Sequence, residues 1–146
     1  MLENGINIKI FGSNWNIHEL FNYTYDIKPK NGEEYFSTIA HSKICLAFLS
    51  KLNRDDYTRR NFEIPATGSL MLSERTEELT SFFKENEEAV FFSSKEEALE
   101  KIIWMLNNEK ESEIIALKGR YRAFQSGYDI DSRVKHLIYQ INGKAE

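Results

Sequence analysis

Cysteine and proline are scarce in this sequence, and each scarcity excludes a class of protein. The one cysteine, Cys45, cannot form a disulfide within the chain, so a scaffold held by disulfides is excluded. Two prolines and seven glycines leave no flexible linker or low-complexity tract. No apolar run is long enough to cross a bilayer, and the N-terminus has no secretory signal. We therefore expect a protein of a reducing compartment, the cytoplasm.

Charge of one sign is not in large excess either. The 19 Lys and Arg residues stand against 23 Asp and Glu residues, a formal net charge of −4, which argues against a nucleic-acid or membrane-surface binder. His18, His41 and His136 are scattered without the spacing of metal ligands, so we predict no metal site and no cofactor. The 146 residues, 41% of them hydrophobic, are enough for one domain with a real core.

Short apolar runs alternate with helical patterns along the chain. The runs predict strands at residues 7–11, 44–49, 70–72 and 89–92, the second of them fully buried. The patterns predict helices at 16–23, 33–41, 76–83, 95–106, 110–125 and 131–141, besides one that ends at Gly68. Strands that alternate with helices favour a parallel sheet with helices on both faces. We therefore predict an α/β fold.

Several side chains indicate how the later helices begin and pack. Thr76 is placed to cap one helix, and Ser94 with Glu97 forms the capping box of the next. The last two helices have no strand between them, so we expect them to pack as a terminal pair. The inward-facing residues of the final helix would be Val134, Leu137, Ile138 and Ile141.

Charged residues gather between the second and third predicted strands. Asp55 or Asp56 can cap a helix there, and Gly68 can end it in a left-handed conformation. Ligands of a β-α-β unit sit beyond the carboxyl ends of its strands, and a cationic loop at a helix N-terminus suits a phosphate. The basic residues are Lys51, Arg54, Arg59 and Arg60. Two simpler interpretations stay open: the aspartates serve only as a cap, and the basic residues form a solvated face.

The same stretch resembles a known family. It reads Asn53-Arg-Asp-Asp-Tyr-Thr-Arg-Arg-Asn-Phe-Glu-Ile-Pro-Ala-Thr-Gly-Ser-Leu-Met-Leu-Ser-Glu-Arg-Thr76. This run is similar to the segment that ends the donor-binding half of the spore-maturation (CgeB-like) branch of retaining glycosyltransferases, and the likeness extends over roughly residues 6–107. The resemblance implies a Rossmann-like domain over residues 1–146, the C-terminal half of a GT-B fold. It also implies binding of a nucleoside-diphosphate sugar in metal-independent transfer to an unknown acceptor.

The resemblance assigns roles to two carboxylates eight positions apart. Asp55 stands where the wider superfamily has glutamate, and its role would be at the sugar; Glu63 would bind the ribose hydroxyls. Eight residues of helix span about 12 Å, which suits one carboxylate at each place. Pro65 would bend the helix close to Glu63. The expected donor-binding residues are Arg54, Asp55, Asp56, Tyr57, Thr58, Arg59 and Glu63, and no catalytic residue is assigned.

The resemblance also implies parts that this sequence lacks: a strand and helix ahead of Ile6, and a whole acceptor half. We therefore expect the isolated chain to be inactive in sugar transfer, to need an acceptor half-domain or partner chain, and to self-associate. Whether the chain alone is an enzyme stays open. The alternative function is a non-catalytic Rossmann-like module that binds a nucleotide or a protein.

Overall fold

The computed structural model describes residues 5–12 and 29–143. The chain divides into two compact units, Met1–His41 and Ser42–Glu146. In the described part of the first unit, helix α1 spans Gly32–Ala40, close to the predicted range. The helix predicted at 16–23 lies outside the described residues.

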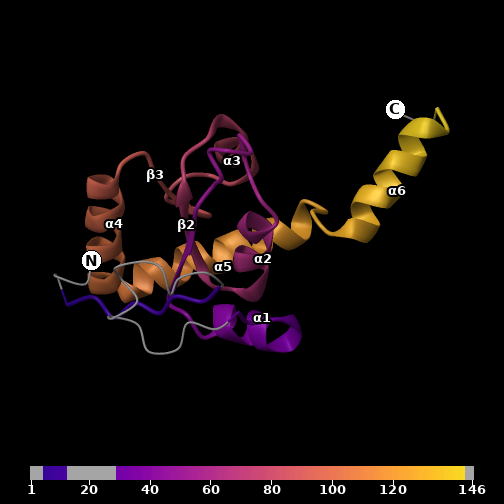
Figure 1. Cartoon of the computed structure of the whole chain (residues 1–146). Coiled ribbons are helices and arrows are strands. Elements are labelled where there is room, and N and C mark those ends of the chain that lie inside the picture. The colour runs from indigo at the N-terminus through magenta and orange to yellow at the C-terminus, as the bar shows by residue number, and fades with distance from the viewer. Residues whose placement is uncertain (1–4, 13–28, 144–146) are drawn as a thin grey trace. The chain divides into compact units, whose positions relative to one another are not determined.

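The second unit carries the sheet and five further helices (Figure 1). Its elements are β1 (Ile44–Ala47), α2 (Arg60–Thr67), β2 (Leu70–Glu74), α3 (Glu77–Phe82), β3 (Val90–Phe92), α4 (Lys95–Asn107), α5 (Glu109–Gln125) and α6 (Ile130–Ile141). The strands lie in the order β1-β2-β3 and both pairings are parallel. Ile44 lies opposite Leu70, and Leu72 lies opposite Val90. The predicted α/β fold with a parallel sheet flanked by helices is confirmed.

One predicted strand is missing from this sheet. Residues 7–11 form no strand, although their exposure alternates as the sequence pattern requires: Ile8 and Ile10 are half-buried, and Asn7 and Lys9 are exposed. The prediction was wrong because alternation reports only which side chains face away from water. A strand also needs a neighbouring backbone to accept and donate its hydrogen bonds, and the pattern does not supply one.

The core gathers around β2, and β1 is not the fully buried strand that its apolar run predicts. Leu70, Met71 and Leu72 are buried, whereas in β1 only Ala47 is. β1 pairs with β2 alone, so it is an edge of the described sheet and its side chains are covered less completely. Cys45 is half-buried, and burial raises the pKa of its thiol to about 11.

The predicted helix ends of α3 and α4 and the glycine after α2 are confirmed. The Thr76 side chain accepts a hydrogen bond from the backbone N–H of Leu79, and Ser94 accepts one from Glu97. Gly68 follows α2 with a φ of 88°, the left-handed conformation that favours glycine. These features depend on a few neighbouring residues, which is why the sequence predicts them well.

Helix α6 does not pack as predicted. No residue of α6 is buried, and the four side chains expected to turn inward, Val134, Leu137, Ile138 and Ile141, are 48–75% exposed. The prediction failed because an apolar stripe shows only that a helix has a face to bury. Which surface covers that face is decided by the rest of the fold.

Candidate functional site

The carboxyl ends of the three parallel strands lie at one edge of the sheet, where ligands of such folds bind. The β1–α2 loop (residues 48–59) follows β1 at this edge, and Arg75 and Thr76 follow β2. The Thr76 hydroxyl donates a hydrogen bond of 2.7 Å to the backbone carbonyl of Asp56. The β1–α2 loop is therefore held against the end of β2.

Asp55 closes the β1–α2 loop instead of capping a helix. Its N–H donates to the carbonyl of Ser50 at 3.1 Å, and its carboxylate accepts the N–H of Ser50 at 3.3 Å. Helix α2 begins at Arg60, so the predicted cap by Asp55 or Asp56 is wrong. The reason is that an aspartate bonds whichever backbone N–H the loop presents, and here that group belongs to Ser50.

The helical spacing of the two carboxylates is also corrected. Asp55 lies in the loop, and Glu63 lies on the first turn of α2, so a rise of 1.5 Å per residue does not apply between them. Pro65 lies inside α2, as the sequence requires. The separation of eight positions therefore crosses a boundary between two elements.

Glu63 forms an ion pair with Arg59 across the start of α2. The Nε atom of Arg59 lies 2.8 Å from Oε1 of Glu63, and the side chains are 86% and 16% exposed. The carboxylate thus sits near the protein interior, and the guanidinium reaches into solvent. Of the seven predicted donor-binding residues, these two are brought into direct side-chain contact.

The other predicted residues lie in the same loop with different surroundings. Tyr57 is half-exposed, and its ring packs edge-on against Phe62 and Phe82 at centroid distances of 5.7 and 5.2 Å. Arg54 is exposed and has a φ of 55°, and Asp56 contributes its carbonyl to Thr76. Lys51 and Arg60 are exposed as well, so the basic side chains face water at the N-terminus of α2.

Asn61 is a residue that sequence reasoning missed. Its side chain is fully buried, and its Oδ1 accepts hydrogen bonds from the N–H of Thr58 at 2.8 Å and from the Thr58 hydroxyl at 3.1 Å. Its Nδ2 donates to the Ser73 hydroxyl at 2.9 Å. A signal was present, because Thr58 and Asn61 have the spacing of a capping box, with the amide reaching back to a backbone N–H.

A second missed feature is a charge cluster of Arg75, Glu85, Glu97 and Lys101. The Nη2 of Arg75 lies 2.6 Å from Oε1 of Glu85 and 2.7 Å from Oε1 of Glu97. Lys101 lies 2.9 Å from Glu85 and 3.0 Å from Glu97. Hydrogen bonding to Arg75, then to the N–H of Ser93 and to Lys101, lowers the pKa of Glu97 to about 2. Two cations match two carboxylates, so this cluster ties α4 to the end of β2.

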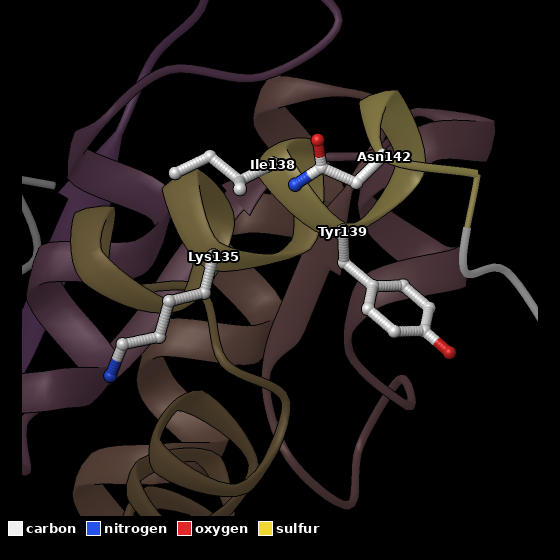
Figure 2. Close-up of a pocket in the computed structure, with 4 residues that line it drawn as sticks. All are labelled: Lys135, Ile138, Tyr139 and Asn142. Carbon is white, nitrogen blue, oxygen red and sulfur yellow. The ribbon is translucent and has the colours of Figure 1, made fainter.

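A pocket on α6 lies apart from this group of residues in sequence. Figure 2 shows its lining side chains, Lys135, Ile138, Tyr139 and Asn142. All four come from one helix or the residue that follows it, whereas the side chains that line a binding site usually come from several elements. Within residues 5–12 and 29–143, no three His, Cys, Asp or Glu side chains are grouped to hold a metal ion. In the same ranges, no helix is long and apolar enough to cross a membrane.

Comparison with known proteins gives one result for nearly the whole chain. A family model described as glycosyl transferase-like matches residues 1–139. The match includes the β1–α2 loop, α2 and the strands on both sides of it. No curated protein matches the chain.

Proposed function

Because the chain belongs to the glycosyl transferase-like family, we propose that it is the donor-binding part of a retaining, metal-independent glycosyltransferase of the CgeB-like kind. The proposal gives it a nucleoside-diphosphate sugar as ligand and an acceptor-binding half or partner chain as partner. The observation that carries it is the placement of Glu63 and Arg59 together at the N-terminus of α2, on the carboxyl edge of a parallel sheet.

Glu63 has the properties expected of a residue that binds ribose. Its carboxylate lies at the first turn of α2 and is mostly shielded from water, so hydrogen bonds from two vicinal hydroxyls would be charge-assisted and protected. Arg59 is solvent-exposed beside it and can turn toward an anion without leaving the site. The Rossmann-like arrangement directs both groups to the same edge of the sheet.

The rest of the β1–α2 loop is suited to bind the diphosphate. The loop is fixed by the hydrogen bonds between Asp55 and Ser50 and between the Asp56 carbonyl and the Thr76 hydroxyl. Ligand binding would therefore cost little loss of conformational freedom in the loop. Basic side chains at a helix N-terminus stabilise negative charge on the leaving diphosphate as the sugar departs. The proposed donor-binding residues are Arg54, Asp55, Asp56, Tyr57, Thr58, Arg59 and Glu63.

Isothermal titration of the chain with uridine, guanosine, thymidine and cytidine diphosphates and their sugars tests the proposal. One of the four diphosphates should bind, and Glu63→Ala should weaken that binding at least about tenfold, because bonds to charged groups contribute about 1.5–3 kcal/mol. The 2′-deoxy form of the ligand should lose affinity for the wild type and not for the variant. Glu77→Ala, which removes an exposed first-turn carboxylate of α3, is the matched control.

The exposed apolar face of α6 favours a second function, a non-catalytic module that binds a protein. Ile130, Leu137 and Ile141 are 81%, 55% and 75% exposed. In soluble proteins the apolar face of a helix is usually covered by another surface. If none of the four diphosphates binds, and substitutions on α6 abolish self-association, this second function replaces the first.

A further inference from the structure

A chain of hydrogen bonds, part-buried at Thr58 and buried from Asn61 onward, runs from the β1–α2 loop to the ends of two strands. The N–H and the hydroxyl of Thr58 donate to Oδ1 of Asn61, and Nδ2 of Asn61 donates to the Ser73 hydroxyl. The Ser73 hydroxyl donates in turn to the backbone carbonyl of Ala47 at 3.1 Å. These hydrogen bonds join the loop, α2, the C-terminal end of β2 and the C-terminal end of β1.

The orientation of the Asn61 amide follows from these partners. The backbone N–H of Thr58 can only donate, so it faces the amide oxygen, and the Ser73 hydroxyl uses its proton on Ala47, so it accepts from the amide nitrogen. Nδ2 also lies 3.6 Å from the sulfur of Met71. A fully buried amide is costly unless it is hydrogen-bonded, and Asn61 uses both of its polar atoms.

We propose that Asn61 is a positioning residue, which holds the β1–α2 loop and the first turn of α2 in the geometry that binds the donor. Thr58, which it holds, lies three residues after Asp55, and Glu63 lies two residues after Asn61 on the same helical turn. An apolar side chain could fill the same space but would leave the Thr58 N–H and the Ser73 hydroxyl without this partner. The inference rests on the proposed function for its ligand.

The variant Asn61→Asp makes this role measurable as a dependence on pH. A protonated aspartic acid offers one acceptor and one donor, as the amide does, so the loop should be held at low pH. An ionised carboxylate has no donor for Ser73 and places a charge among Thr58, Ser73 and Met71, which are all uncharged. Burial disfavours that charge, so the loop should loosen only as the pH rises.

Affinity is measured for the diphosphate that binds the wild-type chain most tightly among the uridine, guanosine, thymidine and cytidine forms. The ratio of the variant dissociation constant to the wild-type value should stay near one at pH 5 and rise to about tenfold at pH 8. Titration of the ligand phosphate occurs with both proteins and cancels in the ratio. If Asn61 served only the stability of the fold, the ratio would stay near one at every pH at which the variant remains folded.

Two further variants keep the test independent of whether Asn61→Asp folds well. Ser73→Ala removes one link of the chain and should weaken the same diphosphate by about threefold, since one neutral hydrogen bond contributes about 0.5–1.5 kcal/mol. Met105→Ala is the control, because it opens a cavity in the buried face of α4 without contacting this chain of hydrogen bonds. It should lower the free energy of unfolding and keep wild-type affinity at a temperature where the protein stays folded.

Amide hydrogen exchange of residues 55–58 separates this inference from the proposed function. Those amides should exchange faster in Asn61→Asp at pH 8 than in the wild type at pH 8, and at the wild-type rate at pH 5. If the ratio of variant to wild-type exchange rates in this loop and the ratio of dissociation constants are both independent of pH, Asn61 does not position the loop. If the wild type binds none of the four diphosphates, the proposed function fails, and the exchange rates still decide whether Asn61 holds the loop.

Discussion

The guanidinium of Arg59 lies 2.8 Å from the carboxylate of Glu63, so an exposed cation just before α2 is paired with a largely shielded anion on its first turn. The two residues are four positions apart, the spacing at which side chains of a helix meet. Because the guanidinium is exposed, water and salt screen the pair, and it adds little to stability. The role proposed for Arg59 is to hold a positive charge beside Glu63.

Replacing Arg59 by glutamine should weaken diphosphate binding more than nucleoside binding. Without the guanidinium, the charge of Glu63 repels the phosphates of the ligand, and we expect about fivefold weaker binding of the diphosphate and less than twofold for the nucleoside. The free energy of unfolding should change by less than about 0.5 kcal/mol. Titration calorimetry measures the two affinities, and urea unfolding measures the free energy of unfolding.

Lys95→Gln is the control for Arg59→Gln, because Lys95 is exposed at the start of another helix and lies 3.7 Å from Glu96. It removes the same charge from the protein without altering the β1–α2 loop. Equal losses of diphosphate affinity in the two variants would show that only net charge matters, and the role assigned to Arg59 would be wrong.

Glu97 should contribute stability that is lost in acid. Its pKa is lowered to about 2 by the hydrogen bond from Arg75, so the folded state binds its proton only at lower pH than the unfolded state does. The contribution is therefore fully present above about pH 4.5 and disappears as the pH falls toward 2. In urea unfolding, Glu97→Gln should be less stable than the wild type at pH 7, and the difference should shrink between pH 5 and pH 2.

Glu100→Gln supplies the comparison for Glu97→Gln, since Glu100 is an exposed carboxylate on the same helix. It should follow the wild-type profile through the acid range. A stability difference for Glu97→Gln that is constant from pH 7 to pH 2 would mean that the carboxylate acts by packing and not by its charge.

Gly119→Ala should destabilise the protein, although alanine normally stabilises a helix by about 0.5–1 kcal/mol relative to glycine. A Cβ at position 119 would lie 2.2 Å from the carbonyl oxygen of Glu88, so α5 would have to move away from the chain before β3. Crowding of this kind costs typically about 1–3 kcal/mol. Thermal unfolding measures the loss, and Lys118→Ala, at an exposed neighbour, should leave the melting temperature nearly unchanged. A melting temperature raised by Gly119→Ala would show that this close approach does not hold.

The predictions that succeeded depend on short stretches of sequence. Thr76 and Ser94 cap the helices that follow them because a hydroxyl needs only the N–H three residues later. Gly68 ends α2 because glycine adopts its positive φ without strain. The strand β2 was predicted from three consecutive apolar residues, 70–72, that follow a glycine.

The prediction that failed at Asp55 and the contacts that were missed depend on how the chain folds beyond a single helix or strand. Asp55 was expected to cap a helix, but its carboxylate accepts a hydrogen bond from the N–H of Ser50 within the folded loop. The amide of Asn61 meets Ser73 only because β2 returns beside α2, and no local pattern shows that contact. The charge cluster at Arg75 joins residues up to 26 positions apart, from two loops and α4, which spacing alone does not reveal.

The final prediction concerns the exposed face of α6. If α6 adds no packing, replacing both Leu137 and Ile141 by glutamine should change the free energy of unfolding by less than about 0.5 kcal/mol. Glutamine and leucine have similar helix propensities, so α6 itself should persist. By contrast, Leu79→Ala in the core should cost about 2–5 kcal/mol, since that side chain is fully buried.

The same double variant tests whether the chain self-associates through α6. Exposed apolar side chains on one helix face favour association because burying them removes apolar surface from water. Sedimentation equilibrium at increasing concentration should show association of the wild type and a weaker association of the variant. A wild type that stays monomeric at high concentration would contradict self-association. A double variant that loses several kcal/mol of stability as a monomer would instead show that α6 packs within its own chain.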